Sequence, residues 1–203
     1  MAEMRRFEKL VVNSAPVAWY HRFIGVSRVL RGAGGPLQGP VLEVGCGNGA
    51  TTREWVRRLA GHAVTAVDYD EDQVRRATAR LGGSAQVQRG DVTNLAFPAD
   101  HFGLVVEMNV LHHIPDPLRG LREVYRVLRP GGQFLFMDYA MRSYPSIFRT
   151  LFPPESVFTV AEFETALGNG GFDDIRTSGR RQFTGAARKP APTLHAPTGA
   201  GNH

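Results

Sequence analysis

Three glycines alternate with other residues directly after a short apolar run that carries one carboxylate, Glu43. Glycine adopts positive φ and adds no side chain, so Gly45, Gly47 and Gly49 predict a tight turn with exposed backbone. The apolar run before the turn suits a buried strand of a parallel sheet, and the residues after it suit a helix. A strand, a glycine turn and a helix in this order are typical of a loop that binds a cofactor containing a nucleoside.

Two further carboxylates follow later apolar runs. Asp68 comes after the run 63–67, about 20 residues beyond the glycines, where an acidic residue can accept hydrogen bonds from ribose hydroxyls. Asp91 follows the run 85–89 and one glycine. Loops that bind NAD share the first of these marks, but their third glycine falls one residue later and faces a pyrophosphate. The spacing in this chain therefore favours a cofactor without that phosphate group.

The spacing Glu-x-Gly-x-Gly-x-Gly resembles motif I of the class I S-adenosylmethionine-dependent methyltransferases. The other segments of that family follow in its order, namely Gly90-Asp91-Val92, the run from Met108 to Asp116, and an expected turn at Pro130-Gly131-Gly132 between an amphipathic helix and the fifth strand. Residues 40–139 resemble the small-molecule group that includes the ubiquinone and menaquinone biosynthesis enzymes. One departure is Gly103, where the group usually has aspartate. We interpret it as local to the start of the fourth strand, far from the site.

The resemblance implies S-adenosylmethionine as the cofactor and a set of residues that bind it. Asp68 would contact the ribose, Asp91 the adenine amino group and Asn109 the methionine part. The candidate cofactor-binding residues are Glu43, Gly45, Gly47, Asn48, Gly49, Asp68, Tyr69, Asp91, Val92 and Asn109. No metal site is expected, because the seven histidines and the single cysteine show no metal-ligand spacing.

Methyl transfer is an in-line displacement at a sulfonium, so aligning the nucleophile and excluding water do much of the work. An acceptor that arrives protonated also needs a general base, and His112 and His113 have a suitable unperturbed pKa of about 6.5. Consecutive histidines point in different directions, so at most one faces the site. We take His113 and Tyr20 as catalytic candidates, with helix packing as the alternative for both histidines. Asp138 and Tyr139 either face the acceptor or pack the end of their strand.

The pattern of apolar runs predicts the elements that position these residues. We expect an α/β fold: a Rossmann-like sheet of seven mostly parallel strands with an antiparallel last strand and helices on both faces. Thr51 or Thr52 is expected to cap the helix after the glycine turn, and Thr159 a helix over 159–167. The expected strands are residues 41–44, 63–67, 85–89, 104–107, 133–136, 172–177 and 183–188.

The chain divides into three parts. Residues 1–39 are expected to form a helical cover with helices over 3–12 and 16–31, residues 40–189 the S-adenosylmethionine-binding domain, and residues 190–203 a disordered tail. The cover either walls off the acceptor or only shields an edge of the sheet. The aromatic segment 141–156 is where the family usually inserts acceptor-binding structure.

Length, composition and charge bound the location and the partners. A chain of 203 residues with 42% hydrophobic content suits one domain. No apolar run reaches the ~20 residues that span a bilayer, and no secretory signal is visible. We expect a cytoplasmic protein, with a peripheral position at the inner membrane face as the alternative. The basic, amphipathic residues 3–12 either lie on an anionic membrane surface or dock on the body of the protein.

The acceptor is predicted to be a small molecule, with a phospholipid head group or a quinone at the membrane surface as the alternative. Nucleic acid is disfavoured, because residues 109–112 replace the Asp-Pro-Pro-Tyr-like signature of enzymes that methylate base amino groups. The chain also lacks a Pro-Cys nucleophile for cytosine carbon-5 chemistry. An alternative of another class is a regulator or partner subunit that binds S-adenosylmethionine without turnover. The oligomeric state is not predicted.

Overall fold

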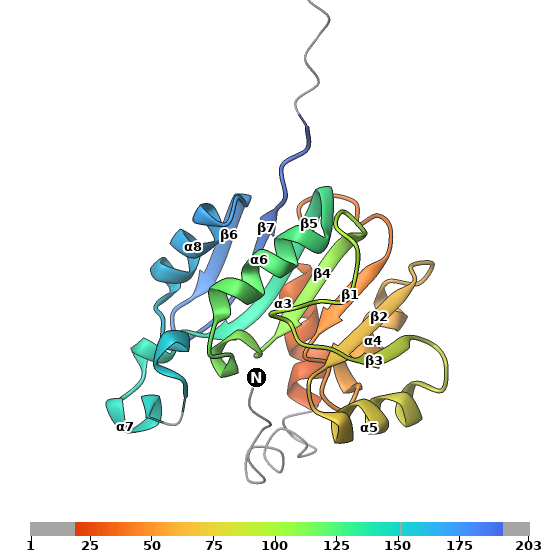
Figure 1. The fold of residues 1–203 in the computed structure, drawn as a ribbon, viewed down its shortest axis with the longest axis horizontal. Coiled ribbons are helices and arrows are strands. Elements are labelled where there is room, and N and C mark those ends of the chain that lie inside the picture. The colour runs from red at the N-terminus through yellow and green to blue at the C-terminus, as the bar shows by residue number, and fades with distance from the viewer. Residues whose placement is uncertain (1–18, 151, 193–203) are drawn as a thin grey trace, which may run out of the picture.

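The computed structural model describes residues 19–150 and 152–192. Its strands form one sheet in the order β3-β2-β1-β4-β5-β7-β6 (Figure 1). The strands are β1 (Val41–Val44), β2 (Val64–Asp68), β3 (Gln86–Arg89), β4 (Phe102–Met108), β5 (Leu128–Tyr139), β6 (Asp173–Gly179) and β7 (Gln182–Arg188). Strands β1 to β5 pair in parallel, whereas β7 runs antiparallel to both β5 and β6. The predicted seven-stranded sheet with an antiparallel last strand is confirmed.

Helices cover both faces of the sheet, as the sequence predicts (Figure 1). On one face α3 (Val26–Leu30) and α4 (Ala50–Arg58) pack against β1, β4 and β5, and α5 (Glu71–Leu81) packs beside them. On the other face α6 (Pro117–Val127) and α8 (Val160–Asn169) cover an apolar core that contains most of the buried phenylalanines. Apolar burial on both faces explains why β1 and β4 are buried along their whole length.

The strand order fixes where a ligand can bind. From β1 the chain winds outward through β2 to β3, and then returns to β4 on the other side of β1. The two crossovers diverge between β1 and β4, which leaves a crevice at the carboxyl ends of these strands. The glycine turn after β1 and Asn109 after β4 therefore lie at the same place in the fold.

Short helical segments cluster at this carboxyl edge of the sheet. They are η1 (Tyr20–Gly25), η2 (Leu111–His113), η3 (Met141–Ser143), α7 (Ser146–Arg149) and η4 (Pro154–Ser156). Segments η1 and α3 occupy most of the range predicted as one helix over 16–31. The predicted helix over 3–12 and most of the predicted tail lie outside the described residues.

Two local predictions have different outcomes. Thr159 caps α8 as expected, in a capping box in which its side chain accepts from the amide of Glu162 and Glu162 bonds back to the amide of Thr159. The segment Pro130-Gly131-Gly132 was expected to be a turn before the fifth strand. Instead it lies inside β5, where the pairing with β4 shifts register between Phe102 and Leu104. The glycines thus form an irregularity within the strand.

Gly103 is explained by a close approach of two backbone segments. A Cβ atom at this position would lie 1.5 Å from the carbonyl oxygen of Gln38, and the amide of Gly103 donates to the carbonyl of Pro40 at 2.9 Å. Any side chain would push the segment before β1 away from β4. The absence of the family's usual aspartate is therefore a steric requirement at the end of the sheet remote from the glycine turn.

Replacing Gly103 with alanine should lower the free energy of unfolding by several kcal/mol, at least ~2, because backbone must move to make room. Urea unfolding monitored by circular dichroism measures this change. The matched control is Gly168→Ala in α8, where the nearest atom to the new Cβ is Ile175 Cδ1 at 3.9 Å, so stability should stay within about 1 kcal/mol of the unchanged protein. Equal stability of the two variants would contradict the explanation of Gly103.

Candidate functional site

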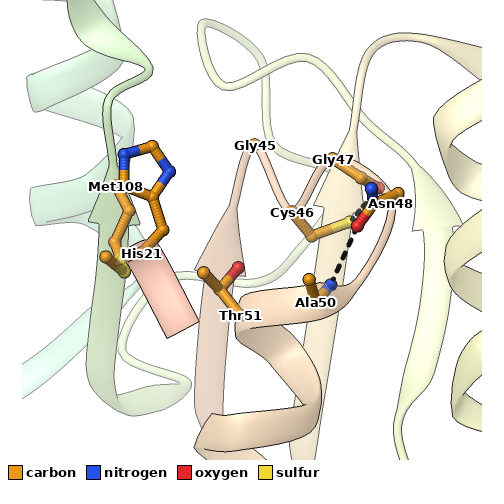
Figure 2. A pocket seen from close by; sticks show the side chains of 8 residues that line it. All are labelled: His21, Gly45, Cys46, Gly47, Asn48, Ala50, Thr51 and Met108. Carbon is orange, nitrogen blue, oxygen red and sulfur yellow. Dashed lines mark hydrogen bonds between the residues drawn. The ribbon is translucent and has the colours of Figure 1, made fainter. Parts of the chain in front are cut away.

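A pocket opens at the carboxyl ends of β1 and β4. Figure 2 shows the glycine turn on one side of it and the side chains of His21 and Met108 on the other. The residues that line it are His21, Gly45, Cys46, Gly47, Asn48, Ala50, Thr51 and Met108. Three of the predicted cofactor residues, Gly45, Gly47 and Asn48, thus line one cavity.

The three glycines of the turn serve different purposes, although all have positive φ. A Cβ at Gly45 would lie 2.2 Å from a methyl carbon of Val110, and one at Gly49 would lie 3.0 Å from Ala77. These two glycines allow close packing against neighbouring segments. At Gly47 no atom lies within 4 Å of the Cβ position, so the backbone there faces open space. Gly47 is the part of the turn that a ligand can approach most closely.

The carboxylate of Glu43 is directed at helix α4. It is buried and accepts hydrogen bonds from Thr51 Oγ1 at 2.7 Å, Thr52 Oγ1 at 2.5 Å and Trp55 Nε1 at 3.0 Å. Burial raises the pKa of Glu43 to about 7, and the three hydrogen bonds oppose that shift. Glu43 therefore fixes the start of α4 relative to β1, and it does not line the pocket.

This arrangement corrects the predicted cap of α4. Thr51 and Thr52 lie inside the helix and donate to Glu43, so neither hydroxyl caps the helix. The residue before the helix is Gly49, with φ of 76°, and it has no side chain to offer. Asn48 takes part of the role, because its Oδ1 accepts from the amide of Ala50 at 3.2 Å (Figure 2). The two threonine hydroxyls bond to the carboxylate of Glu43 on β1 and not to the first backbone amides of α4.

Asp68 supports the glycine turn from the end of β2. Its Oδ2 accepts from the amide of Gly47 at 2.7 Å, and its Oδ1 accepts from the amide of Asp70 at 2.9 Å. The side chain is mostly buried. The carboxylate predicted to contact the ribose therefore adjoins the backbone of Gly47, although Asp68 is not itself among the residues that line the pocket.

The remaining predicted residues on this side follow β2 and β3. Asp91 Oδ1 accepts from both the amide and the hydroxyl of Thr93, each at 2.8 Å, which fixes the turn after β3. Val92 is buried in the core beneath α6. Tyr69 lies under the guanidinium of Arg89, 5.4 Å from the ring centre. Asp91, Val92 and Tyr69 lie outside the residues that line the pocket.

Asn109 lies directly behind the wall formed by His21 and Met108, in an unusual backbone conformation, and is not itself among the residues that line the pocket. Its φ is 62°, in the left-handed region that asparagine tolerates better than most residues, and its amide donates to the carbonyl of Met137 at 2.6 Å. The side-chain amide nitrogen donates to His21 Nε2 at 3.1 Å. Burial lowers the pKa of His21, which keeps the ring neutral and able to accept. Asn109 Oδ1 is buried and has no partner among the described residues.

Sequence reasoning missed His21 and Met108 as pocket residues. His21 lies 88 positions before Asn109, and no motif surrounds it. Only the packing of η1 beside β4 brings the two side chains together. Met108 could have been found from its place at the end of the fourth predicted strand, directly before Asn109.

The two consecutive histidines differ in their surroundings. His112 is buried, and Asp138 accepts from both its Nδ1 and its backbone amide, the latter at 3.3 Å. The backbone carbonyl of His112 accepts from Ser156 Oγ at 2.7 Å. His112 therefore packs and anchors η2, which is the alternative that the sequence left open. Asp138 is fully buried in this contact, which favours the second of its two predicted roles, packing at the end of its strand.

His113 is partly exposed and packs its ring on Phe152, with the ring centres 5.3 Å apart. Burial, and secondarily the neighbouring His112, lowers the pKa of His113 to about 3. The His113 ring is therefore neutral at physiological pH, and one of its nitrogens can accept a hydrogen bond. The side chain of the other catalytic candidate, Tyr20, lies outside the described part of the structure.

A second buried carboxylate, Glu107, lies on the strand next to Asp138. Its Oε2 accepts from the amide of Val110 at 3.0 Å, and its Oε1 has no partner among the described residues. Burial and the nearby Asp138 raise the pKa of Glu107 well above its ordinary value. Glu107 and Asp138 together fix the backbone of residues 109–113 from below.

Aromatic rings gather where the segment 139–156 meets η2. Tyr139 contacts His112 at 5.4 Å and Tyr144 at 6.2 Å between ring centres, and Phe152 contacts both histidines at 5.3 Å. Tyr139 also accepts a hydrogen bond from Gln182 at 3.1 Å. The segment that begins at η3 thus places aromatic surface next to His113.

Comparison with known proteins identifies the class to which this fold and site belong. Residues 42–136 match the family described as "Methyltransferase domain". The structure superposes on a SAM-dependent methyltransferase from Aquifex aeolicus with a TM-score of 0.73 and 19% identity, covering 92% of this chain and all of that one. Residues 42–136 form a methyltransferase domain, and the chain has the fold of the class I S-adenosylmethionine-dependent methyltransferases.

Two curated relatives are named for lipophilic compounds. The chain is 30% identical over 156 residues to the chloroplastic 2-methyl-6-phytyl-1,4-hydroquinone methyltransferase of Arabidopsis thaliana, which covers 73% of this chain and 45% of that protein. It is 38% identical over 100 residues to the phthiotriol/phenolphthiotriol dimycocerosates methyltransferase of Mycobacterium tuberculosis, which covers 48% of this chain and 37% of that protein. The chain therefore spans less than half the length of these relatives.

The raised pKa of Glu43 predicts a pH-dependent stability. In the unfolded chain the group titrates near its ordinary value of 4.5 and in the folded protein near 7, so the folded state binds more protons between these values. The free energy of unfolding should fall as pH rises from 4.5 to 7, by on the order of 3 kcal/mol for this group. Urea unfolding at a series of pH values measures the slope. The variant Glu43→Gln should show a shallower slope in this window, and an unchanged slope would contradict the assignment.

Proposed function

We propose that the protein transfers a methyl group from S-adenosylmethionine to a small-molecule acceptor. The observation that carries this proposal is the pocket between the backbone of Gly47, which Asp68 supports, and His21, which Asn109 holds by a hydrogen bond. The buried Oδ1 of Asn109 has no partner among the described residues. The methyltransferase relatives and the class I fold agree with it.

The residues present fit S-adenosylmethionine. The open space over Gly47 accommodates a flat ligand against backbone, and the neighbouring Asp68 carboxylate supplies an acceptor for ribose hydroxyls. Asn109 Oδ1 is an acceptor for the ammonium group of the methionine part, and Asp91 an acceptor for the adenine amino group. When bound, the cofactor supplies an electrophilic methyl group on its sulfonium.

We do not assign every predicted cofactor residue to direct contact with S-adenosylmethionine. We assign Glu43 to holding the start of α4, Gly49 to packing on α5, and Val92 to the core beneath the adenine region. Gly45, Gly47, Asn48 and Tyr69 remain proposed contacts on the side of the glycine turn.

The acceptor side is proposed to start at His113 and to continue along Tyr139, Tyr144 and Phe152. These side chains favour an acceptor with an aromatic or other apolar surface, such as a hydroquinone. His113 accepts a hydrogen bond from a hydroxyl group of the methyl acceptor, and this bond orients that hydroxyl. With a pKa of about 3 it does not retain the proton at neutral pH, so the proton passes on to water. Tyr20 is retained as a second candidate.

A lipid acceptor at a membrane surface is the second candidate function. The curated relatives named above act, by their names, on compounds with long apolar chains. No helix among the described residues is long and apolar enough to cross a membrane. The proposed membrane contact through residues 3–12 lies outside the described residues.

Radiolabelled methyl transfer tests the function directly. The protein and labelled S-adenosylmethionine are incubated with a lipid extract and, separately, with an extract of soluble metabolites, and the products are resolved by chromatography. Label in the organic phase supports a lipid or quinone acceptor, and label in the aqueous phase supports a soluble one. Cofactor binding without label in either phase would favour a regulator or partner subunit without turnover.

Replacing Asp68 with alanine should weaken S-adenosylmethionine binding about tenfold to a hundredfold, since each lost charged hydrogen bond contributes ~1.5–3 kcal/mol. Titration calorimetry measures the affinity. The matched control is Asp72→Ala, because Asp72 is exposed in the first turn of α5 and lies outside the pocket. Thermal unfolding of both variants separates lost binding from lost stability, and unchanged affinity in a folded Asp68→Ala variant would defeat the assignment.

A further inference from the structure

We propose that segments η1 and α7 form a docking edge for the surface of an anionic lipid bilayer. The docking edge is defined by four exposed apolar side chains: Trp19, Phe23, Ile24 and Ile147. The inference rests on the proposed function, and it specifies that the acceptor reaches the site from a lipid phase.

The exposed apolar residues are concentrated in these two segments and in Trp19, which directly precedes η1. Trp19 is 57% exposed, Phe23 and Ile24 are each 39% exposed, and Ile147 is 71% exposed. Among the described residues only one other large apolar side chain, Leu118 in α6, is comparably exposed. Trp19 and Phe23 contact each other, with ring centres 5.8 Å apart. Aromatic and branched apolar side chains of this kind suit the boundary between lipid head groups and acyl chains.

Both segments flank the candidate site. Segment η1 contributes His21, which bonds to Asn109, and the loop after α7 contributes Phe152, which packs on His113. Figure 1 places α7 and the red start of the described chain at the carboxyl edge of the sheet. The exposed side chains therefore lie on two sides of the loop 109–113. An acceptor that leaves a bilayer at this edge would meet His113 and the aromatic rings beside it.

The charge of the same region is basic. Residues 19–31, 140–156 and 179–182 contain seven arginines and one acidic residue, Glu155. Arg180 and Arg181 are exposed in the turn between β6 and β7, and the carbonyl of Arg181 accepts from the amide of Ala140 at 2.7 Å, which places this turn beside η3. Positive charge around exposed apolar residues is complementary to anionic lipid.

Acidic side chains at this edge belong to neighbouring elements. Glu71 and Asp72 begin α5, where Arg75 pairs with Asp72, and Asp116 begins α6, where Arg122 lies 3.9 Å away. Closer to η3, Arg142 pairs with Glu162 in the first turn of α8 at 3.3 Å. The positive charge of this edge therefore rests on the remaining arginines, which include Arg149, Arg180 and Arg181. We therefore expect the bilayer to contact the protein along η1 and residues 141–156, and not along the starts of α5 and α6.

The geometry favours a bilayer over a folded partner. The apolar residues lie on two separate short segments with the site between them. Each segment can insert independently into a fluid interface, whereas a rigid partner must be complementary to both at once.

Flotation of the full chain with vesicles tests the proposal. Vesicles of phosphatidylcholine with phosphatidylglycerol should bind the protein, and pure phosphatidylcholine vesicles should bind it at least about fivefold more weakly. The variant Trp19→Ser/Phe23→Ser/Ile147→Ser should lose about tenfold or more in affinity for the anionic vesicles. Arg149→Glu/Arg180→Glu should reduce binding to anionic vesicles and leave binding to neutral vesicles unchanged.

The matched control is Leu118→Ser, which removes an exposed apolar side chain outside the docking edge and should leave vesicle binding unchanged. Equal losses for Leu118→Ser and the triple variant would overturn the proposal, as would equal binding of the unchanged protein to both vesicle types or no vesicle binding. Calorimetry with S-adenosylmethionine on each variant separates the two levels of inference. Normal cofactor binding without vesicle binding rejects the docking edge alone, whereas absent cofactor binding rejects the proposed function.

Discussion

The bonds that Glu43 and Asp68 accept fix the geometry on which the site depends. Glu43 joins β1 to the first turns of α4, and Asp68 joins the end of β2 to the amide of Gly47. Between these two contacts the chain must reverse within five residues, which requires glycine at positions with positive φ. The exposed backbone of the turn is therefore held by side chains that lie behind it, and this leaves its front surface available for a ligand.

The opposite wall follows a similar principle with different residues. Two buried carboxylates on adjacent strands, Glu107 and Asp138, accept from backbone amides of the segment after β4. These contacts hold Asn109 in a left-handed conformation and direct the chain into η2. A buried carboxylate without enough donors is unfavourable, and Glu107 responds with a raised pKa. The burial of Glu107 therefore lowers the stability of the fold next to the loop that carries Asn109 and His113.

The proposed acceptor side differs in structure from the proposed cofactor side. The cofactor side consists of backbone and carboxylates on rigid strand ends, whereas the acceptor side consists of aromatic rings on short helical segments. Such segments tolerate changes in sequence more readily than strand ends do, because few of their backbone groups belong to the sheet. We infer from this division that acceptor choice rests on η1 and on residues 141–156.

The sequence by itself determined the sheet, the glycine turn and the strand-end carboxylates, because these depend on local patterns: apolar runs, alternate glycines and an acidic residue at a fixed distance. It also predicted Thr159 as the cap of α8, whereas the reciprocal bond from Glu162 became visible only in the structure. Only the tertiary structure decided which hydroxyl or ring each carboxylate would bind: Thr51 and Thr52 bond to Glu43, and His112 bonds to Asp138. The pairing of His21 with Asn109 was likewise invisible, since 88 residues separate them. The physical reason is that hydrogen-bonding side chains choose among partners by proximity, and proximity between distant segments is set by packing.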